Sequence, residues 1–164
     1  MRRLLAAAFV LACCTPALAA SGPCMPGAAI DIPTRDGVAA VVGQVIITGY
    51  DVTQSVRLRL ALEKDSLCQD SIERIQAEEL ERQKTEETWI FEARQHNISV
   101  APAEVDARIA ALAATSGNTV DGLKARLAQA SVELAALRRE IAVEIAHAKV
   151  TGRPTAFPYR IAAR

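Results

Sequence analysis

The sequence has few of the residues on which catalysis and metal binding usually depend. Its 164 residues include two histidines and four cysteines, and neither type occurs at the close spacing of a zinc site. No glycine-rich phosphate-binding loop is present. Glu140 and Glu144 precede His147 by seven and three residues, which is ordinary surface spacing, so we interpret His147, like His96, as a solvated side chain. We therefore expect no enzyme activity, no catalytic residues, no cofactor and no metal site.

Aromatic residues and an excess of either charge are also lacking. Aromatic side chains make up 4% of the chain against 51% hydrophobic residues, so we expect a core built from Ala, Val, Leu and Ile. The 19 basic residues are matched by 19 acidic ones. Such a balance produces no field that would gather nucleic acid or an anionic membrane surface, and we expect no nucleic-acid partner.

Long apolar runs are missing outside the N-terminus. The first residues include two arginines, an apolar stretch over residues 4–12 and a small-residue ending. This order is typical of a secretory signal peptide. We predict a signal peptide over residues 1–19 that is cleaved between Ala19 and Ala20, giving an exported protein with no integral membrane segment after signal removal.

Two alternatives to a cleaved signal rank lower. An uncleaved membrane anchor conflicts with the shortness of the apolar stretch, because a spanning helix needs roughly 20 residues. The run Val10-Leu11-Ala12-Cys13 is similar to a lipobox and offers lipoprotein anchoring at Cys13. That choice would leave an unusually short signal, so we prefer ordinary cleavage.

Signal removal leaves two cysteines, Cys24 and Cys68. In an oxidising compartment two thiols can form a disulfide, which would tie the mature N-terminus to the end of the first helix. Geometry decides whether such a bridge forms. Both a Cys24–Cys68 disulfide and two unpaired thiols remain open.

The mature chain opens with an arm and a pair of strands. Residues 20–37 are rich in Gly, Pro, Ser and Thr, which is typical of a flexible arm. Two β-branched runs, 38–42 and 45–47, flank Gly43, and this pattern predicts a short strand pair. Because two strands alone are marginally stable, we expect them to pack on helices.

Capping signals predict the first two helices. Thr48 and Asp51 fit a capping box that begins the first helix. A second capping box at residues 70–73 begins a longer helix, which we expect to end near Asn97. Every residue from 81 to 88 is polar. We interpret this stretch as a solvated section with paired charges along an exposed surface, in preference to a polar docking surface.

Three amphipathic helices follow. They begin at Pro102, after Thr119 and near Leu134. Their apolar residues recur at helical spacing, and we expect these to face the core: Val105, Ile109, Leu112, Val120, Leu123, Leu127, Leu134, Leu137, Ile141 and Ile145. The predicted fold is mainly α, with five helices and a short N-terminal strand pair over residues 38–152, followed by a basic C-terminal tail over residues 153–164.

In their order along the chain, these signals resemble the N-terminal domain of the SurA-type periplasmic chaperones. That domain opens with a valine-rich strand, a second strand ending in Ile-Thr and a helix beginning with Asp-Val, as at Ile47-Thr48 and Asp51-Val52. The rest of the resemblance is carried by Glu92-Ala93, Asn97, Ile98-Ser99-Val100, Glu104-Val105-Asp106, Ile109, Gly117, Thr119, Leu123, Leu127, Leu137, Arg138 and Ile141. The ordered set, not a single motif, carries it.

Two features depart from the family pattern. Polar residues stand at Gln83, Lys84 and Thr88 where members usually carry apolar ones, and Ala101 and Glu133 stand where members carry a serine cap. Full-length members also continue into parvulin-type prolyl isomerase modules. No such module fits in the remaining sequence, so we do not carry the family's isomerase activity over to this chain.

The resemblance implies an ATP-independent periplasmic chaperone-like protein whose partners are unfolded outer-membrane or periplasmic polypeptides. An uncovered apolar groove would hold these clients. Trp89 and Phe91 are our candidate client-binding residues, against the simpler interpretation that both pack in the core. Two other functions stay open: an assembly subunit that self-associates as a homodimer through its exposed apolar face, and a prolyl isomerase by family name only.

Overall fold

The computed structural model describes residues 32–34, 36–63, 71–154 and 157–159. The predicted signal peptide, the alternative lipid attachment at Cys13, and the cysteines Cys24 and Cys68 lie outside these residues. Cleavage between Ala19 and Ala20 and the disulfide therefore stay predictions.

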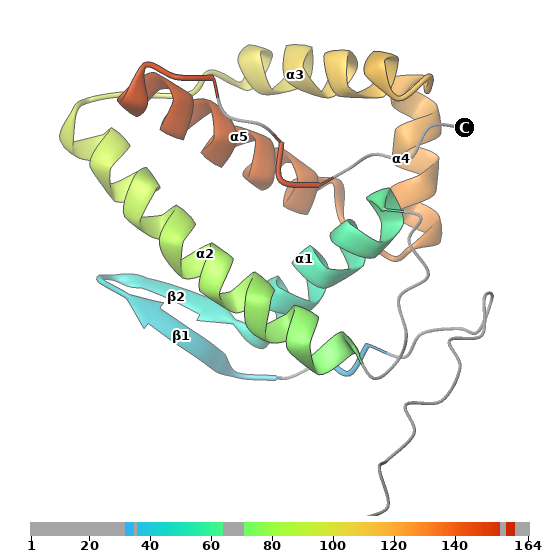
Figure 1. The fold of residues 1–164 in the computed structure, drawn as a ribbon, viewed down its shortest axis with the longest axis horizontal. Coiled ribbons are helices and arrows are strands. Elements are labelled where there is room, and N and C mark those ends of the chain that lie inside the picture. The colour runs from blue at the N-terminus through green and yellow to red at the C-terminus, as the bar shows by residue number, and fades with distance from the viewer. Residues whose placement is uncertain (1–31, 35, 64–70, 155–156, 160–164) are drawn as a thin grey trace, which may run out of the picture.

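Two strands and five helices follow one another along the described chain (Figure 1). They are β1 (Val38–Val42), β2 (Val45–Thr48), α1 (Gly49–Leu62), α2 (Ile72–Gln95), α3 (Pro102–Thr115), α4 (Val120–Gln129) and α5 (Leu134–Thr151). The predicted mainly α fold with an N-terminal strand pair is confirmed. None of the helices in the described part of the chain combines the length and apolar character that crossing a membrane requires.

β1 and β2 form an antiparallel hairpin in which Val42 lies opposite Val45. Gly43 opens the two-residue turn with a φ of 60°, a left-handed value that glycine adopts without steric cost. The inner face of the hairpin packs on the helices, as expected. Its small apolar cluster is formed by the buried residues Ile47, Val52, Val56 and Ile75.

The predicted start of α1 and the predicted end of α2 are confirmed, whereas at the start of α2 the side chain of Ser71 makes no capping hydrogen bond. The backbone N–H of Asp51 donates to Thr48 Oγ1 (3.2 Å), and the backbone N–H of Thr48 donates to Asp51 Oδ2 (2.9 Å), so the capping box begins α1. The second helix ends just before Asn97, whose φ is 55°. This left-handed conformation closes a helix.

α2 runs through the middle of the molecule (Figure 1). The hairpin packs on α2, as do α1 and α5. α3 packs on α5 and on α4. These three helices and the end of α1 enclose the larger of two apolar clusters, the smaller one being the cluster beneath the hairpin. The molecule therefore has two apolar clusters, with α2 passing between the hairpin and α5.

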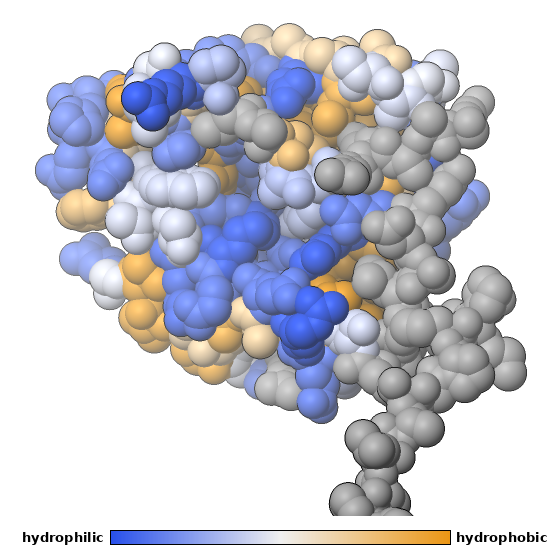
Figure 2. All heavy atoms as spheres, in the orientation of Figure 1, coloured by the Kyte–Doolittle hydropathy of each residue, from blue (hydrophilic) through white to orange (hydrophobic). Residues whose placement is uncertain are grey.

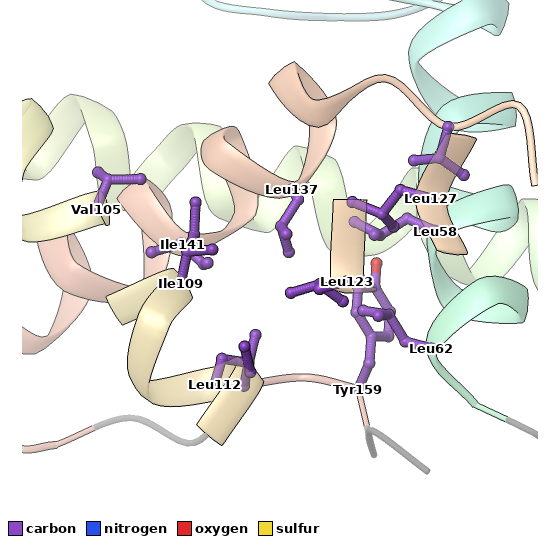
Figure 3. Packing of buried hydrophobic residues seen from close by; sticks show 12 residues of the cluster. Leu58, Leu62, Val105, Ile109, Leu112, Leu123, Leu127, Leu137, Ile141 and Tyr159 are labelled. Carbon is purple, nitrogen blue, oxygen red and sulfur yellow. The ribbon is translucent and has the colours of Figure 1, made fainter. Parts of the chain in front are cut away.

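The larger apolar cluster fills the space between α1, α3, α4 and α5 (Figure 3). The residues predicted to face the core that are buried there are Val105, Ile109, Leu112, Leu123, Leu127, Leu137 and Ile141. Val120, Leu134 and Ile145 are partly buried and pack against the same cluster. Each helix buries one apolar stripe, so the periodicity predicts this cluster correctly.

Candidate functional site

One face of the middle of α2 is buried, although the sequence predicts a solvated section. Glu79, Gln83, Glu86 and Glu87 are 2%, 1%, 3% and 8% exposed, because α1 and α5 both pack against α2. The prediction of paired charges along α2 is confirmed, as in the pairs of Arg82 with Glu79 and Glu86, and further pairs join α2 to α5. The solvated interpretation is wrong for this face of α2 but holds for Glu81, Thr85 and Thr88, which are exposed. We call this contact the polar seam; its members are Glu79, Arg82, Gln83, Glu86 and Glu87 of α2 together with Arg139 and Glu140 of α5.

Arg82 lies at the centre of the polar seam. Its Nη2 donates to Glu79 Oε2 (2.6 Å) and to Glu140 Oε1 (3.0 Å), and its Nη1 pairs with Glu86. Burial acts to lower the pKa of Arg82, but the hydrogen bond to Glu140 and the neighbouring negative charges outweigh it and raise that pKa. The guanidinium therefore stays charged and binds carboxylates from two helices.

Arg139 extends the polar seam from the side of α5. Its Nη2 lies 2.6 Å from Glu87 Oε1, and its Nη1 lies 3.2 Å from Glu86 Oε2. Acids still outnumber bases locally. Burial, followed by the charge of Glu140, raises the pKa of Glu86 from 4.5 to about 7. Glu86 is thus the member of the seam whose charge changes near neutral pH.

Gln83 joins α2 to α1. Its Nε2 donates to Ser55 Oγ (2.7 Å) and to the backbone carbonyl of Asp51 (3.2 Å). Its Oε1 is buried and has no hydrogen-bond partner within the described ranges. An unpaired buried acceptor costs free energy, and this cost offsets part of what the two hydrogen bonds of Nε2 contribute. The main effect of Gln83 is therefore to fix the position of α2 on α1.

Trp89 stacks on His147 across the contact between α2 and α5. Their ring centroids lie 4.0 Å apart and the ring planes differ by 21°. The solvated interpretation of His147 is therefore wrong; its Nδ1 is buried and finds no hydrogen-bond partner among the residues that the structure describes. His96, in contrast, is exposed as expected.

Two hollows meet at this stack, and we call them together the Trp89 groove. The deeper one has a volume of about 230 Å³, and its walls include Glu86, Trp89, Glu140, Val143, His147 and Pro158. The shallower one measures about 440 Å³ and extends toward the hairpin, with walls that include Val42, Thr85, Thr88, Trp89 and His147. An aromatic ring therefore borders both a carboxylate-lined cavity and an open hollow.

The two candidate client-binding residues lie in different surroundings. Trp89 is half-buried in the wall of the groove, whereas Phe91 is 60% exposed and lines neither hollow. Neither residue belongs to the larger apolar cluster. No observation tests client binding at either side chain, so their role stays a prediction.

The outer face of the hairpin exposes an apolar surface that the sequence analysis did not assign. Val38, Val41 and Ile46, which we call the hairpin patch, are 63%, 62% and 57% exposed. Figure 2 shows apolar residues gathered over the hairpin, at the lower left of the view, beside hydrophilic ones. Successive strand residues point to opposite faces, so the consecutive valines and isoleucines of these strands were a usable signal that one apolar face stays uncovered.

The carboxylates of the polar seam are engaged by arginines. In the described ranges, no group of three or more His, Cys, Asp or Glu side chains is placed to hold a metal ion. Among the surfaces of the described residues that are open to another molecule are the Trp89 groove and the hairpin patch. Their character is aromatic and apolar, with acidic groups at one side of the groove.

The fold defines a small, mainly helical domain with an N-terminal hairpin. A family model described as the SurA N-terminal domain matches residues 35–151. The chain therefore belongs to the SurA N-terminal domain family, a chaperone-type domain of periplasmic proteins, and the resemblance seen in the sequence is confirmed. No curated protein and no solved structure matches the chain significantly.

Proposed function

We propose that this protein is an ATP-independent, chaperone-like protein that binds unfolded outer-membrane or periplasmic polypeptides in the periplasm. The family match over residues 35–151 carries the proposal. The order of residues 1–19 supports export, because it fits a cleaved secretory signal. The hairpin patch adds physical support, since contiguous exposed apolar surface marks interaction sites.

The Trp89 groove suits an extended client segment. It connects the hairpin end, at Val42, with the contact between α2 and α5 at His147. The ring of Trp89 offers a large rigid surface to apolar and aromatic side chains. Such contacts form and break without a covalent step, so holding a client this way requires no nucleotide.

A second candidate function rests on the hairpin patch. Both strands of the two-stranded sheet are edge strands, whose backbone groups can pair with another chain, and the hairpin patch on the outer face offers apolar side chains to the same partner. The patch therefore also favours an assembly subunit that self-associates as a homodimer. No observation in the described part of the chain favours prolyl isomerase activity, and we do not propose it.

Aggregation of an unfolded outer-membrane β-barrel protein gives the first test. The mature chain from Ala20 is added without nucleotide, light scattering is followed, and the same sample is analysed by size-exclusion chromatography. We expect suppression of scattering at near-stoichiometric amounts. A stable dimer that leaves the scattering unchanged would overturn the chaperone proposal in favour of the assembly role.

Trp89→Ala tests where the client binds. Removing an aromatic anchor commonly weakens binding by about tenfold or more, so we expect this variant to need correspondingly more protein for the same suppression. Phe91→Ala is expected to have a smaller effect. Lys124→Ala, at an α4 side chain that is 50% exposed, is the control. Wild-type suppression by folded Trp89→Ala would exclude the groove as the client site.

A further inference from the structure

Phe157, Pro158 and Tyr159, which we call the tail segment, lie against the helices in the manner of a bound peptide. The hydroxyl of Tyr159 donates to Glu79 Oε2 (3.0 Å) and accepts from Arg82 Nη2 (2.6 Å). The guanidinium carbon of Arg82 lies 5.2 Å from the centre of the Tyr159 ring. The ring of Phe157 meets that of Tyr159 edge-on, with centroids 5.6 Å apart. One aromatic residue therefore anchors the segment.

The Tyr159 ring occupies a socket between the helices. Tyr159 is 6% exposed and belongs to the larger apolar cluster (Figure 3), with Leu62 and Leu123 among the labelled members. Apolar side chains thus surround the ring, while Glu79 and Arg82 receive its hydroxyl. Burial, followed by the charges of Glu140 and Glu79, raises the pKa of Tyr159 well above its ordinary value, so the socket accepts a neutral phenol.

Side chains, not backbone, hold the tail segment. Among the residues that the structure describes, the backbone of 157–159 makes no hydrogen bond to the helices. Pro158 is exposed, and its ring forms part of the wall of the Trp89 groove. The segment is therefore attached as a peptide ligand is, through an anchor residue and its neighbours, and not as an element of the helix bundle.

The socket keeps its charge balance when the tyrosine leaves. Arg82 retains Glu79, Glu86 and Glu140 as partners, and Glu79 retains Arg59 at 3.3 Å in addition to Arg82. Departure of Tyr159 breaks two hydrogen bonds to charged groups, but it leaves no charge unpaired. An empty socket is thus compatible with the folded polar seam.

We propose that this socket is a binding site for an extended polypeptide segment that delivers a tyrosine, and that the tail segment occupies it in cis until such a segment replaces it. Because Pro158 lines the Trp89 groove, replacement also opens one wall of that groove. The identity of the replacing segment as part of an unfolded client rests on the proposed function. The existence of the socket does not.

A synthetic peptide with the sequence of residues 155–164, labelled at its N-terminus, tests the socket by fluorescence anisotropy. The probe is added to the full mature chain and to Tyr159→Ala, whose socket is empty. The cis segment competes at high effective concentration in the wild type, so we expect Tyr159→Ala to bind the probe at least about tenfold more tightly. A probe carrying alanine in place of its tyrosine is expected to bind neither protein.

Circular dichroism tests whether Tyr159→Ala is folded. If this variant is unfolded, Tyr159→Phe replaces it, because it keeps the ring and loses only the two hydrogen bonds. We expect a smaller gain in probe affinity from Tyr159→Phe. Equal binding of the tyrosine and alanine probes, or no binding to a folded variant, would overturn the proposal.

The same proteins separate the site from the function. If an unfolded β-barrel protein displaces the probe from Tyr159→Ala, competition between client and tail is supported; failure to displace it contradicts that part. If the protein binds the probe but does not suppress aggregation, the proposed function is contradicted and the socket is supported. If the protein suppresses aggregation but none of its folded variants binds the probe, the socket is contradicted and the proposed function is supported.

Discussion

Two regions of the interior are built from opposite chemistry. Apart from the ring of Tyr159, the buried members of the cluster between α1, α3, α4 and α5 are aliphatic side chains, of which Leu137 and Ile141 are fully buried. In the polar seam beside it, the carboxylates are buried as deeply, with Glu79 at 2% and Glu86 at 3% exposure. One helix, α5, contributes to both regions.

The comparison teaches that burial alone does not define how a region stabilises the fold. Aliphatic packing depends on volume and tolerates changes that conserve it. A buried charge cluster depends on partner identity, because removing one partner leaves the other charges desolvated and unpaired. The two regions should therefore fail in different ways when their central residues are replaced.

Arg82→Ala should have the largest effect. The change removes the cation shared by Glu79, Glu86 and Glu140, and breaking a buried pair costs about 3–5 kcal/mol. Urea unfolding followed by circular dichroism measures the loss. Arg74→Ala, at a side chain that is 62% exposed and paired with Glu78, is the matched control and should cost less than about 1 kcal/mol. Similar losses for both variants would show that the polar seam contributes no more to stability than an exposed ion pair.

Leu137 provides the aliphatic counterpart. Leu137→Ala should lower the free energy of unfolding by about 3 kcal/mol, because it leaves a cavity, whereas Leu137→Met should cost less than about 1.5 kcal/mol. Arg82→Lys, formally as conservative, loses the fork-shaped guanidinium and should cost more than Leu137→Met in the same urea titration. The opposite order would show that the polar seam is as tolerant as the aliphatic cluster.

Glu86 adds a pH dependence that the aliphatic region lacks. In the folded protein Glu86 keeps its proton up to a pKa of about 7, against 4.5 for an ordinary glutamate. Its contribution to stability is therefore complete below about pH 4.5 and is lost as the pH rises through 7. We therefore expect the free energy of unfolding of Glu86→Gln, measured relative to that of wild type, to rise by on the order of 2 kcal/mol from about pH 5 to about pH 8.

Urea midpoints across that pH range measure the gain. Glu81→Gln, at a side chain that is 70% exposed, is the control and should follow the wild-type profile. A constant difference between Glu86→Gln and wild type would show that Glu86 is ionised throughout.

Gln83 and Ser55 should give the smallest net effect. Gln83→Leu removes an orphan acceptor but leaves the Ser55 hydroxyl without its donor, so we expect a loss of about 1 kcal/mol. Adding Ser55→Ala should recover most of it, because replacing both partners of a buried hydrogen bond is nearly neutral. If the losses of the two single variants add in the double variant, the hydrogen bond itself stabilises the contact, and the cost of leaving one partner unpaired is not the cause.

The sequence predicts the aliphatic region and the helix ends because their signals are local. A capping box such as Thr48 with Asp51 spans four residues, and the stripe that contains Leu137 and Ile141 repeats within one helix. Each signal is complete before any tertiary contact forms. The same holds for Asn97, which ends α2 through its own backbone conformation.

The polar seam and the candidate sites could not be predicted in this way. Arg82 meets Glu140 and Tyr159 from positions 58 and 77 residues away, and a charged stretch looks the same in sequence whether water or another helix covers it. Trp89 could be singled out as an unusual residue, but its stacking on His147 depends on how α2 crosses α5. The tail segment could be recognised as aromatic, not as the occupant of a socket.

Trp89 also gives the protein a built-in reporter. It is the single tryptophan of the chain, and it touches His147 of α5 from its place on α2. Intrinsic tryptophan emission from this molecule therefore arises at one junction and at no other. The polarity around this ring changes when a polypeptide binds beside the indole, when the tail segment leaves or when α2 and α5 separate. The intrinsic fluorescence of Trp89 therefore reports each of these events without an added dye.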